Sequence, residues 1–177
     1  MISEADGDLL RRFRAGDRDA FTALYRTHNA CVFRFARLMT GDPVKAAEVT
    51  QDVFVWLIHH PGEFDPERGG LSGFLVGVAR KFLKRRSREE QRWVPLGETA
   101  IAPELRSESA HDAELLRQAI AALPVRYREV VALCGLEGKS YEDAAAIVDC
   151  AVGTVRSRLH RARALLARKL VGRGCPV

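Results

Sequence analysis

The spacing of apolar residues is the feature that most restricts the fold of this 177-residue chain. Between Leu71 and Phe82 the large apolar residues recur three or four positions apart, which places them on one face of an α-helix. Similar spacing recurs through most of the chain, and no segment shows the strict alternation of a half-buried strand. We therefore predict an all-α protein.

Proline, glycine and short polar residues divide the chain into helices. Gly41 ends a long helix, Asp42-Pro43 starts the next one, and Pro61-Gly62 stops it. Residues 63–70 read as a loop, so residues 1–92 are predicted to form a four-helix bundle. Residues 93–112 are acidic and lack periodicity, which predicts a flexible linker. Residues 113–177 then form a second domain of four helices.

Basic residues are concentrated in two short windows. The net charge is +5, yet residues 80–92 contain seven cations and residues 152–173 contain seven more with no acid. Two separate basic segments favour a protein that binds a polyanion through two surfaces. The alternative is that both segments are simply solvated helix faces.

A short helix over residues 141–147 precedes a longer basic helix over residues 152–170, which is the pattern of a helix-turn-helix. Val155 and Leu159 are predicted to anchor the longer helix. Four residues would then point outward, namely Arg156, Ser157, His160 and Arg161. Arginine suits this position because its guanidinium can meet two acceptors of guanine or a phosphate. Nearby cations would meet the DNA backbone, namely Arg158, Arg163, Arg168 and Lys169. A helical hairpin with solvated arginines is the alternative.

Several classes of function find no support. The sequence has no GxxxxGK[ST], GxGxxG, GxSxG or HExxH motif, so we predict no catalysis and no cofactor. His28 and Cys31 could begin a zinc site, but no second half follows at metal spacing. The acidic start of the chain and the shortness of its apolar runs predict a cytoplasmic protein without membrane insertion.

Three stretches of the second half resemble the extracytoplasmic-function (ECF) sigma factors of bacterial RNA polymerase. They are Leu123-Pro124-x2-Tyr127-Arg128-Glu129-Val130-Val131, Gly138-Lys139-Ser140-Tyr141-Glu142-Asp143-Ala144-Ala145, and the segment from Val152 to Arg163. The first half is similar to the family in Asp19-Ala20-Phe21, in Glu48-x2-Gln51-Asp52-Val53-Phe54 and in Leu71-x2-Phe74-Leu75. The resemblance covers nearly the whole chain, in the family's order of two domains and a linker.

The resemblance implies three binding surfaces. The last helix would read the −35 promoter element through Arg156, Ser157, Arg158, His160 and Arg161. The loop and the basic helix of the first domain would melt and hold the −10 element through Phe64, Arg68, Phe74, Arg80, Lys81, Lys84, Arg85 and Arg88. The residues implied to dock on the β′ clamp of the polymerase are Glu48, Gln51 and Asp52.

The implied partners are core RNA polymerase through its β′ clamp and β flap, promoter DNA, and an anti-sigma factor. Two other functions stay open: a helix-turn-helix regulator that binds DNA without polymerase, and an RNA-binding protein. Departures from the family pattern affect two surfaces. Lys45-Ala46-Ala47-Glu48 leaves one acid where the family has a cluster, which predicts weaker polymerase affinity or assistance, for example through modification of Thr50. Phe74 and Lys81 replace a tryptophan and an asparagine on the expected −10 surface.

Overall fold

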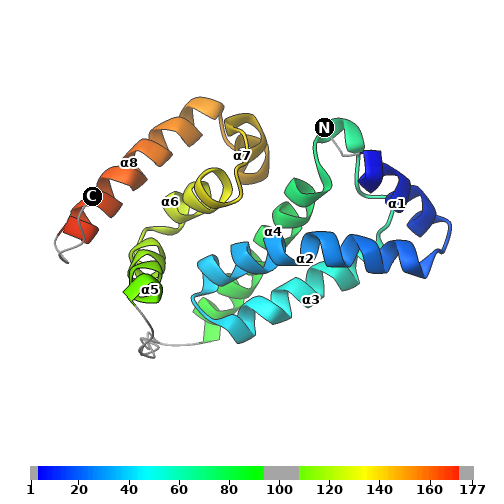
Figure 1. The fold of residues 1–177 in the computed structure, drawn as a ribbon, viewed down its shortest axis with the longest axis horizontal. Coiled ribbons are helices and arrows are strands. Elements are labelled where there is room, and N and C mark those ends of the chain that lie inside the picture. The colour runs from blue at the N-terminus through cyan, green and yellow to red at the C-terminus, as the bar shows by residue number, and fades with distance from the viewer. Residues whose placement is uncertain (1–3, 94–107, 172–177) are drawn as a thin grey trace.

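The computed structural model describes residues 4–93 and 108–171, and every regular element among them is helical. Figure 1 shows α1 to α4 on the right and α5 to α8 on the left. The predicted all-α class with two helical domains is therefore confirmed. Most of the predicted linker, residues 94–107, lies outside the described residues.

The N-terminal half contains α1 (Glu4–Arg14), α2 (Arg18–Thr40), α3 (Pro43–His59), the 3-10 turn η1 (Pro66–Arg68) and α4 (Leu71–Trp93). Short polar residues set the helix starts as the sequence indicates. The Asp17 carboxylate accepts hydrogen bonds from the first backbone N–H groups of α2, and Asp42 does the same for α3. Gly41 ends α2 with φ 74°, a left-handed conformation that glycine adopts without strain.

The C-terminal half contains α5 (Glu108–Ala121), α6 (Val125–Val130), the π-helical segment η2 (Val131–Leu136), α7 (Tyr141–Val148) and α8 (Val152–Val171). Two boundaries differ from the prediction. Helix α5 begins at Glu108, inside the stretch assigned to the linker, rather than at Ala113. The single helix expected over residues 125–136 instead widens into a π-helix after Val130, and the Glu137 N–H reaches back five residues to the Ala132 carbonyl at 3.0 Å.

One continuous apolar cluster joins the two halves. Its buried members run from Leu10 in α1 to Ala162 in α8, with Phe35, Leu75 and Leu133 among the most enclosed. Helices α2 and α4 pack against α6 and α7, as Figure 1 shows, so the two halves share an interface. The arrangement therefore determines which basic residues remain open to solvent.

Candidate nucleic-acid and protein interfaces

Helices α7 and α8 form the predicted helix-turn-helix. The Ser140 hydroxyl accepts a hydrogen bond from the Asp143 N–H at 3.0 Å and caps α7. Ala144 of α7 and Val155 and Leu159 of α8 are buried in the apolar cluster. Small side chains on α7 let the two helices approach closely, which fixes the outward face of α8.

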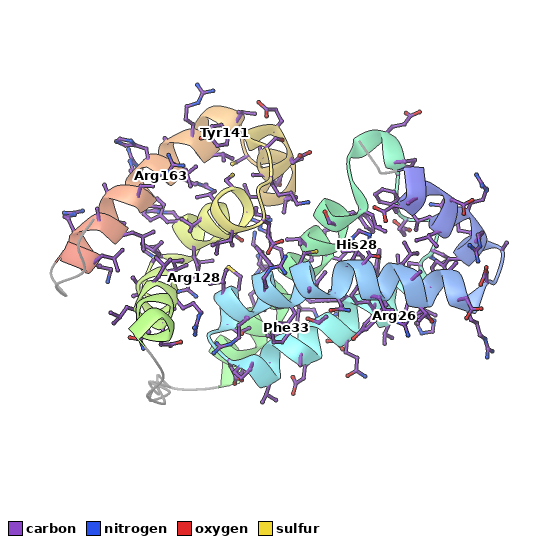
Figure 2. The ribbon with its side chains drawn as sticks, in the orientation of Figure 1. Arg26, His28, Phe33, Arg128, Tyr141 and Arg163 are labelled. Atoms are coloured by element: carbon purple, nitrogen blue, oxygen red, sulfur yellow. The ribbon has the colours of Figure 1, made fainter. Side chains whose placement is uncertain are left out.

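The outward face of α8 carries the expected −35 residues. Four of them are exposed, namely Arg156, Ser157, His160 and Arg161, while Arg158 is half-buried. The Ser157 hydroxyl donates to the Thr154 carbonyl at 3.0 Å, so part of its hydrogen-bonding capacity is used within the helix. Arg163, labelled on this helix in Figure 2, is also exposed. The surface offers several guanidinium groups to an anionic partner.

Tyr127 of α6 is a neighbour of this surface that the sequence analysis did not assign to it. A hydrogen bond from Arg161 lowers the pKa of the Tyr127 phenol. The guanidinium carbon of Arg126 lies 4.9 Å from the centre of the same ring. Arg161 therefore lies near a side chain of α6. This neighbour could not be predicted from the spacing of residues within α8, because Tyr127 lies on another helix.

A second cationic surface lies on α4, the α4 cationic face, defined by Lys81, Lys84, Arg85 and Arg88. All four residues are exposed. The Arg85 guanidinium carbon lies 5.6 Å from the centre of the Phe82 ring, close enough for a cation–π contact. The side chain of Arg68, another expected −10 residue, lies outside the described residues. Four of the expected residues are thus available on a single helix.

The remaining expected −10 residues are less accessible. Phe64 is only 3% exposed, and its ring meets that of Phe74 edge-on at 5.3 Å, so it anchors the loop before α4. Phe74 is half-buried and also contacts Trp56. Arg80 was expected on the exposed part of α4, but its side chain is 12% exposed and forms an ion pair with Glu129 of α6. In this conformation Phe64 and Arg80 therefore point into the protein.

The three expected polymerase-docking residues lie on α3. Gln51 is exposed, and the carboxylates of Glu48 and Asp52 bind one guanidinium, that of Arg86 from α4, at 2.9 and 2.7 Å. All three charged side chains keep substantial exposure. Arg86 is a docking-face residue that the sequence analysis did not assign, because the spacing within α3 gives no sign of a neighbour on α4.

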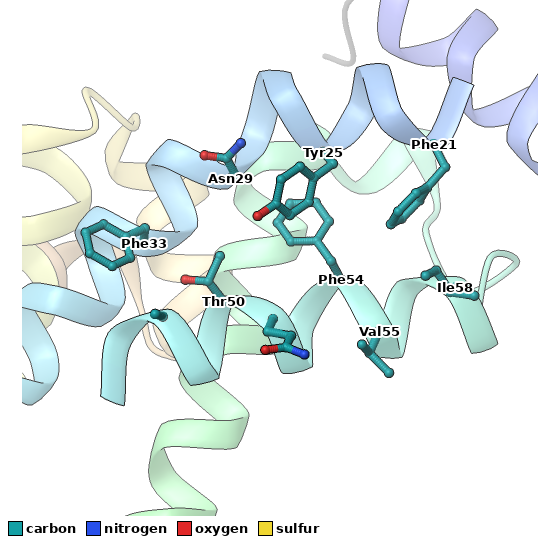
Figure 3. Close-up of a pocket in the computed structure, with 10 residues that line it drawn as sticks. Phe21, Tyr25, Asn29, Phe33, Thr50, Phe54, Val55 and Ile58 are labelled. Atoms are coloured by element: carbon teal, nitrogen blue, oxygen red, sulfur yellow. The ribbon is translucent and has the colours of Figure 1, made fainter. Parts of the chain in front are cut away.

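An open groove between α2 and α3 adjoins Gln51. Its volume is about 460 Å³, and Figure 3 shows the aromatic side chains along it. The lining is mostly apolar: Phe21, Tyr25, Phe33, Phe54, Val55 and Ile58, with the polar Asn29, Thr50 and Gln51. The exposed apolar residues Val55 and Ile58 follow Gln51 at helical spacing, a signal that could have revealed this groove from the sequence.

Thr50, His28 and Cys31 are all at least partly buried within α2 and α3. The Thr50 hydroxyl donates to the Ala46 carbonyl at 2.8 Å and the residue is 6% exposed, which argues against modification at this position. His28 is buried beside Asp6 at 2.9 Å, and the Cys31 thiol donates to the His28 carbonyl. Burial raises the pKa of the Cys31 and Cys134 thiols. Within residues 4–93 and 108–171, no cluster of acids, histidines and cysteines suits a metal ion.

Each half of the chain matches a known protein family. Residues 24–93 match the family of sigma-70 region 2, and residues 113–166 match sigma-70 region 4. The chain is 34% identical over 140 residues to the ECF RNA polymerase sigma factor EcfG of Rhodopseudomonas palustris, covering 77% of each protein. The chain belongs to the ECF sigma factors. Such proteins are transcription initiation factors, so this ECF sigma factor takes part in promoter recognition with RNA polymerase.

Other relatives cover more of this ECF sigma factor. It is 32% identical over 166 residues to SigM of Mycobacterium tuberculosis, with 94% of this chain and 85% of the relative covered. The structure of CnrH in complex with the cytosolic domain of CnrY aligns with a TM-score of 0.74 and 25% identity, over 96% of this chain and 99% of CnrH. RpoE of Bartonella quintana, bound to the anti-sigma factor NepR, aligns with a TM-score of 0.70 and 29% identity. The alignment covers 85% of this chain and 96% of RpoE.

Membership of this family disfavours the alternative of a regulator that acts without polymerase. Among the described helices, none combines the length and the apolar character needed to cross a bilayer.

Proposed function

We propose that this sigma factor divides its work between two domains and a linker, over residues 1–92, 93–112 and 113–177. The C-terminal domain reads the −35 element through the outward face of α8, and the α4 cationic face binds the −10 element as it opens. The observation that carries this assignment is the presence of two exposed cationic helices in separate halves of one chain. Binding at one element raises the effective concentration of the other surface at its own element.

On the opened −10 strand, lysine and arginine neutralise phosphates while aromatic side chains stack on unpaired bases. The exposed cations of the α4 cationic face supply the first kind of contact. Two aromatic residues were expected on this surface. Phe74 is the more exposed of the two, because Phe64 is buried. We therefore assign any base stacking to Phe74 and not to Phe64.

For the polymerase we propose docking of the β′ clamp on α3 and on the groove beside it. Glu48 and Asp52 supply negative charge, although Arg86 neutralises part of it. The exposed apolar side chains of the groove supply contact area that depends less on salt. This combination fits a chain in which only one acid of the family's acidic cluster is present. The chain performs no catalysis of its own and acts where the polymerase is, in the cytoplasm.

We also propose that an anti-sigma factor restrains this protein. In one structural relative the sigma factor RpoE is bound by the anti-sigma factor NepR, and in another CnrH is bound by the cytosolic domain of CnrY. The apolar groove between α2 and α3 offers a surface that a second protein could cover.

Run-off transcription with core polymerase tests the proposed function. Arg156→Ala combined with Arg161→Ala should reduce −35-dependent initiation about tenfold or more, because each lost guanidinium contact to a base costs about 1–3 kcal/mol. The matched control is Arg11→Ala with Arg18→Ala, which removes the same charge from exposed positions on α1 and α2.

Unchanged promoter selection by the α8 variant would refute the role of that helix. A separate pull-down with core polymerase distinguishes the two classes of function. Saturable binding is expected for a sigma factor, and its absence would favour a regulator that binds DNA alone.

A further inference from the structure

Arg80 is the best-enclosed link between the two halves of the chain. From α4 its Nε donates to Glu129 Oε1 of α6 at 2.6 Å, and its terminal nitrogens donate to the carbonyl oxygens of Ile147 at 3.2 Å and Val148 at 3.0 Å. The side chains of Arg80 and Glu129 are 12% and 5% exposed. One guanidinium is thus surrounded by a carboxylate and by the free carbonyls at the C-terminal end of α7, where the helix dipole is negative.

Other polar contacts cross the same interface. Arg34 of α2 binds both carboxylate oxygens of Glu137 at 2.7 and 2.9 Å, and the Lys139 ammonium donates to the Ser72 hydroxyl at the start of α4. Arg128 of α6 donates to the Met39 carbonyl of α2 at 2.9 Å, at the boundary visible in Figure 2. These contacts hold α2 against α6 and the residue after η2, and the start of α4 against the turn before α7.

The interface covers Arg80 of the expected −10 residues and leaves the other proposed binding surfaces open. Helices α2 and α4 meet α5, α6, η2 and α7, whereas α8 packs on α5, α6 and α7 of its own half. The outward face of α8 and the groove between α2 and α3 are exposed in this conformation. Arg80, by contrast, donates its N–H groups to oxygen atoms of the protein, so these groups do not point toward a DNA phosphate.

We propose that Arg80 and Glu129 form an intramolecular latch that masks part of the −10 surface, an inference that rests on the proposed function of α4. In the closed chain Glu129 and the two carbonyls take the place of phosphate oxygens around the guanidinium. The guanidinium has five N–H donors in a fixed planar fork, so it cannot serve both sets of acceptors at once. Opening the interface releases Arg80 to a DNA phosphate.

A buried ion pair suits a reversible latch. The cost of removing both charges from water offsets most of their attraction, so the pair adds little net stability while both partners are present. Removing one partner leaves a buried charge without compensation, which drives the halves apart. Once the interface has opened, a polymerase-bound DNA strand offers Arg80 an equivalent anion.

The test compares Glu129→Gln with the wild-type full-length chain. The glutamine keeps the size of the side chain and loses its charge, so the variant should open, seen as a larger radius of gyration in small-angle X-ray scattering. Its affinity for a fluorescein-labelled single-stranded DNA of random sequence should rise about tenfold if the open state is about one tenth populated in the wild type. The control is Glu142→Gln, the same change at an exposed position on α7, which should alter neither measurement.

Arg80→Ala provides a second route to the open state from the other half of the chain. It should expand the radius of gyration like Glu129→Gln but give no gain in affinity, because the released cation is missing. Binding of a duplex carrying the −35 element should stay unchanged in both variants, which verifies that the C-terminal domain is folded.

If both variants keep the wild-type radius of gyration, the latch is overturned. If both expand while the affinity of Glu129→Gln stays at the wild-type level, masking is overturned, whereas the −10 role of the α4 cationic face, which does not include Arg80, is unaffected.

Discussion

At the scale of single residues, two carboxylates on α3 share one arginine. Glu48 and Asp52 both bind Arg86, and all three side chains remain partly exposed. Exposed ion pairs contribute only about 0–1 kcal/mol, because water and salt compete for the same charges. A basic partner can therefore displace Arg86 at little cost.

Arg86→Ala is expected to strengthen binding to core polymerase, by up to about fivefold, because about 1 kcal/mol of competition is removed. Biolayer interferometry with immobilised core enzyme measures the change. Arg11→Ala, an exposed arginine on α1, is the control and should behave as the wild type. A weaker complex would mean that Arg86 positions the acids for the polymerase and does not compete with it.

Some positions of single side chains could be predicted from the sequence, and others could not. The outward positions of α8 follow from helical spacing, because Val155 and Leu159 fix which face is buried. The burial of Arg80 could not be predicted, since Glu129 lies 49 positions away and belongs to the other half. Charge alone does not distinguish an arginine that meets solvent from one that meets a distant carboxylate.

At the scale of elements, the turn of the helix-turn-helix contains the one positive-φ residue other than glycine among the described residues. Asp149 ends α7 with φ 57°, and the Asp149 N–H bonds to the Ala145 carbonyl. Aspartate tolerates this left-handed conformation better than most residues, and β-branched side chains tolerate it poorly. The angle between α7 and α8 therefore depends on the residue at this turn.

We expect Asp149→Val to lower the free energy of unfolding by about 1–2 kcal/mol through left-handed strain. Glycine adopts the left-handed conformation without strain, so the free energy of unfolding of Asp149→Gly should lie within about 1 kcal/mol of the wild-type value. Urea titration followed by circular dichroism measures both values. Equal stability of the valine variant would contradict the left-handed turn.

Helix starts and stops were predictable where local chemistry sets them. Asp42, Pro43 and Gly41 mark their boundaries because capping needs only residues near the helix end. The π-helical segment η2 was missed, because its apolar residues fit an ordinary α-helix equally well.

At the scale of the whole molecule, the positive charges act together as a field. Each phosphate neutralised on binding releases counterions, so the logarithm of the association constant falls linearly with the logarithm of salt concentration. Arg163 lies on α8, exposed, two helical turns after Arg156 and on the same side of the helix. This position suits a contact to the DNA backbone.

Arg163→Ala should weaken binding to duplexes of any sequence and reduce the magnitude of the salt slope by about 1. Fluorescence anisotropy over a series of salt concentrations, with a promoter duplex and a scrambled duplex, measures both effects. Loss of affinity for the promoter duplex alone would instead assign Arg163 to a base contact.

The two-domain order could be predicted from composition and motifs, because an acidic stretch without helical periodicity separates two segments of helical periodicity. The contact between the halves could not, since it depends on which surfaces of two independent helical units meet. The interface is formed by α2 and α4 with α5, α6, η2 and α7, elements that are separated in sequence by the linker region.

The π-helical segment η2 places Glu137 and Lys139 beside Arg34 and Ser72. Removing one residue from a helix rotates all the residues that follow about the helix axis, so shortening this segment by one position would turn both side chains away from their partners. The contacts between the two halves thus depend on the length of η2 as well as on the identity of the residues that follow it. Relatives that differ there by a single insertion would hold their domains differently even if every charged residue were retained.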